Sequence, residues 1–388
     1  MKLCYVLPQY FEDSAENFYH IANFLEKLGK KVQLYVVIEK SNITPDIKNI
    51  KEIYCLDDGK KKISKLNRFY KLIRVYFVLY NQGVNIFFAR SSLTGVFPLI
   101  IANRLLNFNR TNIIFWSCGQ DIVPLSLIPK IRNIKRLISK IVAWFSFRSI
   151  NYLATGPELM VDFYNNKYKI PKAKILTLYN DISLTRFEPI NAQEKSKLKK
   201  KLLGSDKKVM LFVHTFNKAR GIDLLPPIAK IIKDRKINAL IVAIGRSGDY
   251  SSELNHKISD DCLQDYLINL GQMPNKDIDK YYKIADLFLM PSRGEGFPRV
   301  LLEAMACACP AISFNVGGVA NILSPLTTKE LLIPLNDEQR FIEHSIKLIS
   351  QDSTLEELGK KSFEKVSDFS TDKIVDMYVD SIGGLNKK

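Results

Sequence analysis

One pattern runs through the whole chain: short apolar runs alternate with longer stretches in which apolar residues recur at helical spacing. Strands that alternate with helices predict βαβ units and a parallel sheet. In the first half, the strand-like runs are residues 2–10, 31–39, 84–91, 111–119 and 150–156. The pattern starts again with strand-like runs at 207–214, 238–245, 265–271, 284–292 and 310–316. The sequence therefore predicts an α/β protein with two separate parallel sheets.

The two halves are of similar size, and 388 residues are enough for two domains with separate cores. The first half ends in a polar, lysine-rich stretch that is typical of a linker. We expect two doubly wound, Rossmann-like domains: residues 1–188, a linker at 189–206, a second domain at 207–367 and a last amphipathic helix at 368–388. Ligands of open parallel sheets bind beyond the carboxyl ends of the strands. The predicted site is therefore a central cleft that both domains face.

The most informative segment is Arg293–Pro310, RGEGFPRVLLEAMACACP, which directly follows a short apolar run. Pro298 is well placed as the first residue of a helix. The first backbone N–H groups of a helix have no partner inside it, and they bind anions such as phosphate. Here these groups belong to Arg299, Val300 and Leu301.

Two glutamates flank this helix start. Glu295 lies in the glycine-rich turn before it, and Glu303 lies about one turn beyond Arg299 on the same face. Each carboxylate can accept hydrogen bonds from ligand hydroxyls. Gly294 and Gly296 would let the backbone approach a ligand closely, and Gly296 and Phe297 join the predicted donor-binding set. A helix start that binds phosphate, with one such carboxylate on either side, suits a ligand that has a diol, a diphosphate and a second polyol. Such a ligand is a nucleotide-sugar.

Residues 208 to about 370 resemble the C-terminal domain of the retaining GT-B glycosyltransferases of group 1, or family 4. The resemblance is carried by Glu295 and Glu303 at E-x7-E spacing, the helix EAMAC, Pro310 and Gly317–Val319. The first half resembles the family more loosely, through GKKVQLYVV, RSSLTGVFPL and YNDISLTRFEP. The resemblance implies a GT-B fold and metal-independent transfer from a nucleotide-diphosphate-sugar without another cofactor. It places Glu303 at the donor ribose and Glu295 at the transferred sugar.

The loop HTFNKARG departs from the family pattern. The family usually carries an arginine and a lysine here that bind the diphosphate. Arg220 stands where the lysine is expected, but Thr215 stands where the arginine is. Lys218 is a neighbouring cation that would supply the missing charge, or else a surface charge. His214 ends the preceding strand and either contacts the ligand or packs.

The first half also departs from the pattern. In WSCGQD, Cys118 stands where the family often has a histidine before a glycine. Asp121 is the one acid in a strongly basic segment, and it is a candidate catalytic residue that would contact the acceptor. His20 lies on the apolar face of the first helix, where packing is the expected role.

The net charge of +17 is concentrated in the first half. Residues 60–148 contain sixteen lysines and arginines and a single acid. Within this segment, residues 128–148 have the pattern of a basic amphipathic helix with Trp144 near its end. Such a surface fits anionic lipid. Nucleic acid is the rival partner, but a lipid-linked acceptor explains the charge more directly, so no nucleic acid is expected.

Other sequence features predict a cytoplasmic protein that lies peripherally at the inner face of the membrane. No apolar run reaches 18 residues, the N-terminal apolar run is too short for a secretory signal, and the cysteines are scattered. We expect a retaining glycosyltransferase that moves a sugar to a lipid-linked glycan or glycolipid. The alternatives are a transferase with a soluble acceptor, or a catalytically silent subunit that binds a partner enzyme.

Overall fold

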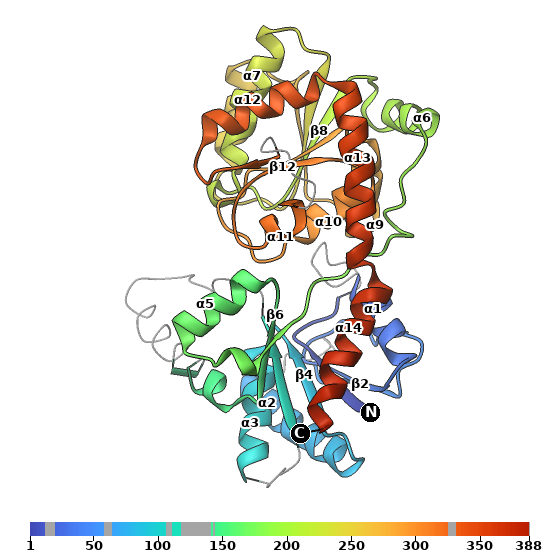
Figure 1. Ribbon diagram of the computed structural model, residues 1–388, viewed down its shortest axis with the longest axis vertical. Coiled ribbons are helices and arrows are strands. Elements are labelled where there is room, and N and C mark those ends of the chain that lie inside the picture. The colour runs from blue at the N-terminus through green and yellow to red at the C-terminus, as the bar shows by residue number, and fades with distance from the viewer. Residues whose placement is uncertain are drawn as a thin grey trace. The chain divides into compact units, whose positions relative to one another are not determined.

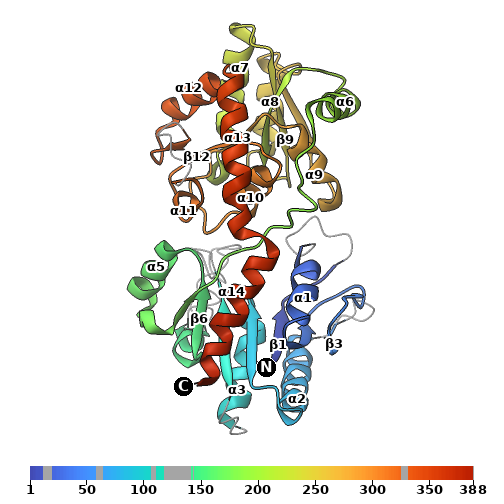
Figure 2. The same cartoon turned by 45° about the vertical axis from the view of Figure 1, so that its right-hand side comes forward.

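The computed structural model describes residues 1–11, 20–57, 64–105, 111–117, 141–142, 144–324 and 331–387. The chain forms two compact units (Figures 1 and 2). Unit 1 comprises Met1–Tyr179 and Thr371–Lys388, and unit 2 comprises Asn180–Ser370. No helix among the described residues is long and apolar enough to cross a bilayer.

Unit 1 is built on a parallel sheet with the strand order β3-β2-β1-β4-β5-β6-β7. Its strands are β1 (Lys2–Leu7), β2 (Gln33–Ile38), β3 (Glu52–Cys55), β4 (Ile86–Arg90), β5 (Asn112–Trp116), β6 (Tyr152–Thr155) and β7 (Ile175–Thr177). The central strands β1 and β4 are buried along almost their whole length, and all their residues but Lys2 and Arg90 are apolar, because helices cover both faces of the sheet. The strand order reverses between β1 and β4, and sites in such sheets lie at this reversal.

The helices of unit 1 divide between the two faces. The helices α2 (Lys65–Asn81), α3 (Leu93–Leu105) and α5 (Glu158–Tyr168) pack on one face. The other face is covered by α1 (Ile21–Gly29) and α14 (Thr371–Gly383), which meet through the rings of Phe24 and Tyr378 at 5.0 Å. Short 3₁₀ helices are η1 (Lys172–Lys174) and η6 (Gly384–Lys387).

Unit 2 repeats the plan with the strand order β10-β9-β8-β11-β12-β13. Its strands are β8 (Lys208–Val213), β9 (Ala239–Ile244), β10 (Leu267–Gly271), β11 (Leu287–Met290), β12 (Ala311–Phe314) and β13 (Leu332–Ile333). Its helices are α6 (Ala192–Leu203), η2 (Lys218–Arg220), η3 (Ile222–Leu224), α7 (Leu225–Asp234), α8 (Ser251–Asp260), α9 (Asn275–Ile284), α10 (Arg299–Ala306), α11 (Val319–Leu323), α12 (Glu338–Ile349), α13 (Asp352–Val366) and η5 (Ser367–Phe369). The order reverses between β8 and β11.

The predicted fold class, two doubly wound parallel sheets, is confirmed, but the boundaries differ from the expected ones. The chain passes between the units at residues 179–180 and 370–371. The expected linker contains α6, which starts with a capping box at Asn191 and belongs to unit 2. The last helix belongs to unit 1, where Lys27 binds Asp372 at 2.7 Å. The polarity of these two segments predicted a linker and a separate last helix. Ion pairs instead attach the first segment to unit 2 and the last helix to unit 1.

The ion pairs of α6 centre on Asp286, just before β11. Its carboxylate is 2.7 Å from Lys195 Nζ and 2.9 Å from Lys199 Nζ, and it accepts a 2.7 Å hydrogen bond from the Val209 N–H. Burial alone would raise the pKa of Asp286, but the charges of the two lysines outweigh it and hold the pKa below its usual value. This contribution to stability is therefore present at neutral pH and is lost as the pH falls through the lowered pKa.

We expect Asp286→Ala to lower the free energy of unfolding of unit 2 by about 3 kcal/mol, because it leaves the buried Lys199 and the half-buried Lys195 without their carboxylate partner. Urea unfolding would measure the change. Asp206→Ala is the matched control, since Asp206 pairs with Lys200 of the same helix at an exposed position and exposed pairs contribute little. Equal stability of the two variants would contradict the expectation.

Candidate active site

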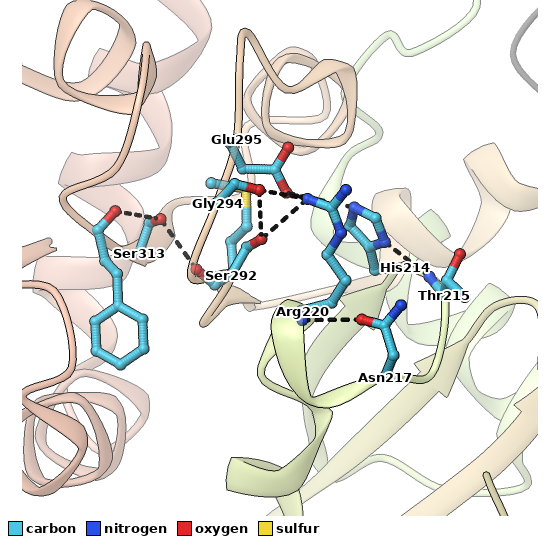
Figure 3. A network of polar contacts seen from close by, with 10 residues as sticks. His214, Thr215, Asn217, Arg220, Ser292, Gly294, Glu295 and Ser313 are labelled. Atoms are coloured by element: carbon cyan, nitrogen blue, oxygen red, sulfur yellow. Dashed lines mark hydrogen bonds and ion pairs between the residues drawn. The ribbon is translucent and has the colours of Figure 1, made fainter. Parts of the chain in front are cut away.

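The loop after β8 lies beside the turn after β11, at the carboxyl edge of the unit 2 sheet where the strand order reverses (Figure 3). The side chain of Asn217 accepts a 3.1 Å hydrogen bond from the Arg220 N–H and so fixes the start of η2. Gly221 then takes a φ of +76°, and a Cβ there would lie 2.1 Å from the Pro291 carbonyl oxygen. A glycine is required at this contact, and it brings Arg220 against the turn.

Arg220 binds the turn after β11 through one nitrogen. Its Nη1 lies 2.5 Å from the Gly294 carbonyl oxygen, 2.7 Å from Glu295 Oε1 and 3.3 Å from Ser292 Oγ. Figure 3 shows these contacts converging on the guanidinium. The arginine thus fixes the position of the Glu295 carboxylate and the course of the turn.

His214 contacts the same carboxylate from the end of β8. Its Nε2 is 3.3 Å from Glu295 Oε1. Its Nδ1 accepts a 2.8 Å hydrogen bond from the Thr215 N–H, so in the neutral ring the hydrogen is on Nε2, which donates to Glu295. His214 was expected either to contact the ligand or to pack. The structure places its ring at the predicted site, where its partner is the Glu295 carboxylate.

Glu295 is held as an anion although its side chain is only 10% exposed. Burial would raise the pKa of Glu295, but the hydrogen bond from His214 and the charge of Arg220 outweigh it and lower the pKa. A fixed, ionised carboxylate can accept hydrogen bonds from hydroxyls or stabilise positive charge.

The helix start that was predicted at Pro298 is the start of α10, and it follows the Glu295 turn. Pro298 precedes the helix, and no side chain among the described residues caps it. Gly317 is required nearby, since it has a φ of +50° and a Cβ there would lie 1.9 Å from the Glu295 carbonyl oxygen. A Cβ at Gly294 would meet no described atom within 4 Å. Packing does not require a glycine at this position, which leaves the space beside it open to a ligand.

Arg299 and Phe297 have structural partners in the segment that enters unit 2. Arg299 Nη2 is 2.6 Å from Asp181 Oδ1, and its Nη1 is 2.6 Å from the Asp181 carbonyl oxygen. The Phe297 ring is buried against Phe369, and its carbonyl oxygen accepts a 2.9 Å hydrogen bond from Asn180. Phe297 was predicted to bind the donor. Its ring is buried and packs on Phe369, so its backbone is the part that a donor would contact.

Glu303 lies on α10, and its environment differs from that of Glu295. Burial raises the pKa of Glu303, and the nearby Tyr282 hydroxyl and the charges of Arg299 and Arg186 offset this only in part. The two carboxyls of the E-x7-E spacing are therefore shifted in opposite directions. Such a split indicates different roles for the two groups.

Other predicted site residues are not brought to this cluster. Lys218 lies 3.8 Å from Glu253 and above the ring of Tyr250 at 5.3 Å, with 64% of its side chain exposed. Two roles were left open for Lys218, a substitute for the charge missing at Thr215 or a surface charge, and its position beside α8 fits the second. Asp121 and Cys118 lie outside the described residues.

Ser292, Asp181 and Tyr282 are polar neighbours of the site that sequence reasoning missed. Ser292 directly follows Pro291 at the strand end, a position at which ligand contacts are common in such sheets. Asp181 lies within YNDISLTRFEP but far from Arg299 in sequence. Tyr282 is on the buried face of α9 and carried no distinguishing signal. Within the described ranges, no group of His, Cys, Asp or Glu is arranged to hold a metal ion.

Comparison with known proteins identifies relatives of this site. The family described as glycosyl transferases group 1 matches residues 193–365. N-acetyl-alpha-D-glucosaminyl L-malate synthase of Bacillus anthracis is 24% identical over 67% of this chain and 64% of that protein. The UDP-Gal:alpha-D-GlcNAc-diphosphoundecaprenol alpha-1,3-galactosyltransferase of Escherichia coli is 29% identical over 54% of this chain and 55% of its own length. The chain thus spans between about half and two thirds of the length of these relatives.

Solved structures match over nearly the whole chain. Sucrose-phosphate synthase from Thermosynechococcus elongatus has a TM-score of 0.74 at 17% identity and covers 99% of this chain and 98% of its own. HepE from Anabaena, in complex with UDP and glucose, has a TM-score of 0.73 at 14% identity and covers 99% of this chain and 100% of its own. At these identities the matches speak for the fold alone, and they confirm the fold class predicted from the sequence.

Proposed function

We propose that this chain, whose residues 193–365 match the family described as glycosyl transferases group 1, moves a sugar from a nucleotide-diphosphate-sugar to a lipid-linked glycan or glycolipid, with retention at the anomeric carbon. The observation that carries this proposal is the buried, ionised Glu295. It is held by Arg220 and His214 directly before the uncapped start of α10. This arrangement combines a site for an anion with a carboxylate that can accept hydrogen bonds from ligand hydroxyls.

The diphosphate would lie between Arg220 and the first N–H groups of α10. Arg220 contacts the turn through Nη1, and a guanidinium has further N–H donors at its other nitrogens. As the bond to the sugar breaks, negative charge develops on the leaving diphosphate. Fixed donors aimed at that charge stabilise the transition state more than the ground state.

The two glutamates would bind different parts of the donor. Glu295 accepts hydrogen bonds from hydroxyls of the transferred sugar, next to the bond that breaks. Glu303, one turn into α10, accepts hydrogen bonds from the ribose diol. Hydrogen bonds to charged groups contribute about 1.5–3 kcal/mol each, which is enough to fix the orientation of the donor.

A lipid-linked acceptor is supported by the basic first half and by one relative. Residues 60–148 carry a large excess of positive charge, and the Escherichia coli relative is named for a diphosphoundecaprenol acceptor. The enzyme would act as a peripheral protein at the cytoplasmic face of an anionic membrane. Each lysine or arginine near such a surface contributes about 1 kcal/mol.

A soluble acceptor is the second candidate. The observation in its favour is the Bacillus anthracis relative, which is named for a product of L-malate. A catalytically silent subunit is supported by Thr215, which stands where the family usually has an arginine, and by Cys118, which stands where the family often has a histidine. The intact glutamate pair with its ion pair argues against that alternative.

The test is sugar transfer by the purified protein, with a panel of nucleotide-sugars and either membrane extract or soluble acceptors. We expect mass spectrometry to detect a glycosylated lipid from one donor. We expect equal yield with EDTA present, because Arg220 and the N–H groups would meet the diphosphate charge without a metal ion. A glycosylated soluble product alone would favour the second candidate. Loss of transfer in EDTA that added Mg²⁺ restores would contradict metal independence.

A further inference from the structure

Exposed apolar side chains gather on one part of unit 1. The described residues include nine large apolar side chains that are exposed, and six of them lie on α2 or on residues 141–149. These six are Leu66, Tyr70, Phe77, Val78, Ile141 and Trp144. Leu66 and Tyr70 are 62% and 58% exposed, and Trp144 is 56% exposed. We call these six residues the apolar patch.

The part of the patch on α2 is a second apolar face of that helix. Leu66, Tyr70 and Phe77 recur at positions i, i+4 and i+11, so they share one side of the helix. The core-facing side is formed by other residues, Leu72, Tyr76 and Leu79, which are buried. A surface helix needs only one apolar face for its own fold. More than half of the Leu66 and Tyr70 side chains remains exposed on the second face, which indicates a surface for a partner outside unit 1.

Aromatic contacts join the segments that carry the patch. The Phe69 ring on α2 is 6.4 Å from the Phe97 ring on α3, and Phe97 is 6.0 Å from Phe145. The patch therefore belongs to one layer formed by α2, α3 and residues 144–149. Figures 1 and 2 both show α2 and α3 side by side in this layer.

All formal charge in this layer is positive. The sequences of α2, α3 and residues 141–149 contain no aspartate or glutamate. Arg68, Lys71 and Arg74 lie on α2, and two further arginines stack on aromatic rings of the layer. Arg148 lies 4.6 Å from the Trp144 ring and Arg104 lies 4.6 Å from the Phe145 ring.

We propose that the apolar patch inserts into the interfacial region of an anionic bilayer, while the surrounding cations bind lipid phosphates. Aromatic and aliphatic side chains with flanking lysine and arginine are the composition of interfacial helices. The absence of acids in the layer favours a phosphate surface over an ordinary protein partner. The inference rests on the proposed lipid-linked acceptor and adds an apolar, salt-resistant attachment to the charge attraction of residues 60–148.

The first experiment separates the two attachments by salt. The protein is sedimented with vesicles of phosphatidylcholine, with and without phosphatidylglycerol. Raising the salt from about 0.1 M to about 1 M shortens the screening length from about 10 Å to about 3 Å. We expect binding to anionic vesicles to weaken but to persist at high salt. In Leu66→Ser/Tyr70→Ser/Phe77→Ser we expect the remaining binding to fall by about tenfold or more, because three apolar side chains no longer insert.

The matched control is Leu159→Ser/Leu335→Ser, which removes two exposed leucines outside the patch. We expect its binding to equal that of the parent. Both variants change only exposed positions, so thermal unfolding should show that they fold. Complete release of the parent protein by salt, or an equal loss in the control, would overturn the proposal.

The second experiment reports on insertion directly. The chain has two tryptophans, and Trp116 is 5% exposed while Trp144 is 56% exposed. Vesicles with brominated acyl chains should quench the fluorescence of Trp144, and Trp144→Phe should remove the quenching. Absence of quenching in the parent would overturn insertion.

Two further outcomes would assign the patch to another partner. A dimer in light scattering that the triple variant dissociates would indicate a second copy of the chain and overturn the proposal. Salt-sensitive RNA binding that the triple variant abolishes would also overturn it. Failure of the proposed function is distinguishable, because it would appear as absent sugar transfer with vesicle binding and quenching intact.

Discussion

Arg220→Lys is expected to lower kcat by about a hundredfold although the positive charge is kept. Arg220 Nη1 alone contacts Ser292, Gly294 and Glu295, which leaves its other N–H groups for the diphosphate. A lysine has a single nitrogen, so it cannot bind the turn and the leaving group from two separate positions. Loss of one donor to developing negative charge typically costs about 10²–10³ in kcat. Steady-state kinetics with the identified donor would measure the effect.

The same loop offers a control and a rescue. Lys218→Ser removes an exposed cation that lies beside Glu253, and we expect activity within about twofold of the parent since exposed pairs contribute little. Thr215→Arg added to Arg220→Lys restores the residue pair that the resembled family usually carries, and we expect it to recover part of the lost kcat. Turnover of Arg220→Ala near the parent value would reject the role of Arg220 and favour a silent subunit.

The parts of this site that the sequence predicted are those with local signals. The apolar run before Pro291, the proline at residue 298 and the E-x7-E spacing all lie within about twenty residues. Parallel strands carry their carboxyl ends to one edge, so the loop with Arg220 was expected near the Glu295 turn. Recognition of both motifs placed Arg220, His214 and Glu295 in one set. The ion pair and hydrogen bonds among them were not predicted and are findings of the structure.

The contacts that were not predicted join segments without a local signal. Asp181 and Arg299 are 118 residues apart, and the patterns that mark their two segments do not indicate that the segments meet. The lysine-rich stretch of α6 was interpreted as a linker, because its partner Asp286 precedes a strand far along the chain. The C-terminal helix α14 belongs to unit 1 through contacts with α1 that helical periodicity does not specify. Strands β7 and β13 are too short for an apolar run to stand out. Strand β3 is as long as β11, but it begins with a glutamate and is only half-buried along its length.

Lys218 illustrates the limit of assigning charge from sequence position. It lies two residues before Arg220 and was expected to face the same anion. In η2, however, the backbone turns between them, and the two side chains leave in different directions. Arg220 binds the turn after β11, whereas Lys218 lies against Tyr250 and Glu253.

Glu295→Gln and Glu303→Gln are expected to fail in different ways. Glu295 is held ionised beside the sugar position, so Glu295→Gln should lower kcat by about a hundredfold or more while donor affinity changes little. Glu303→Gln should weaken donor binding by about tenfold to a hundredfold, the loss of one hydrogen bond to a charged group. Calorimetry with the donor and steady-state kinetics separate the two effects. Unchanged donor affinity in Glu303→Gln would contradict its assignment.

The pKa shifts predict an additional difference on acidification. Burial raises the pKa of Glu303, so it gains a proton at a higher pH than an ordinary glutamate. The pKa of Glu295 is lowered, since the hydrogen bond from His214 and the charge of Arg220 outweigh its burial, so Glu295 stays ionised over that interval. Donor affinity should therefore fall with decreasing pH before kcat does. The Glu303→Gln variant has no carboxyl group to protonate at this position, so its donor affinity should be nearly independent of pH in the same interval. If Glu303→Gln keeps the parent's pH dependence of donor binding, that dependence belongs to another group.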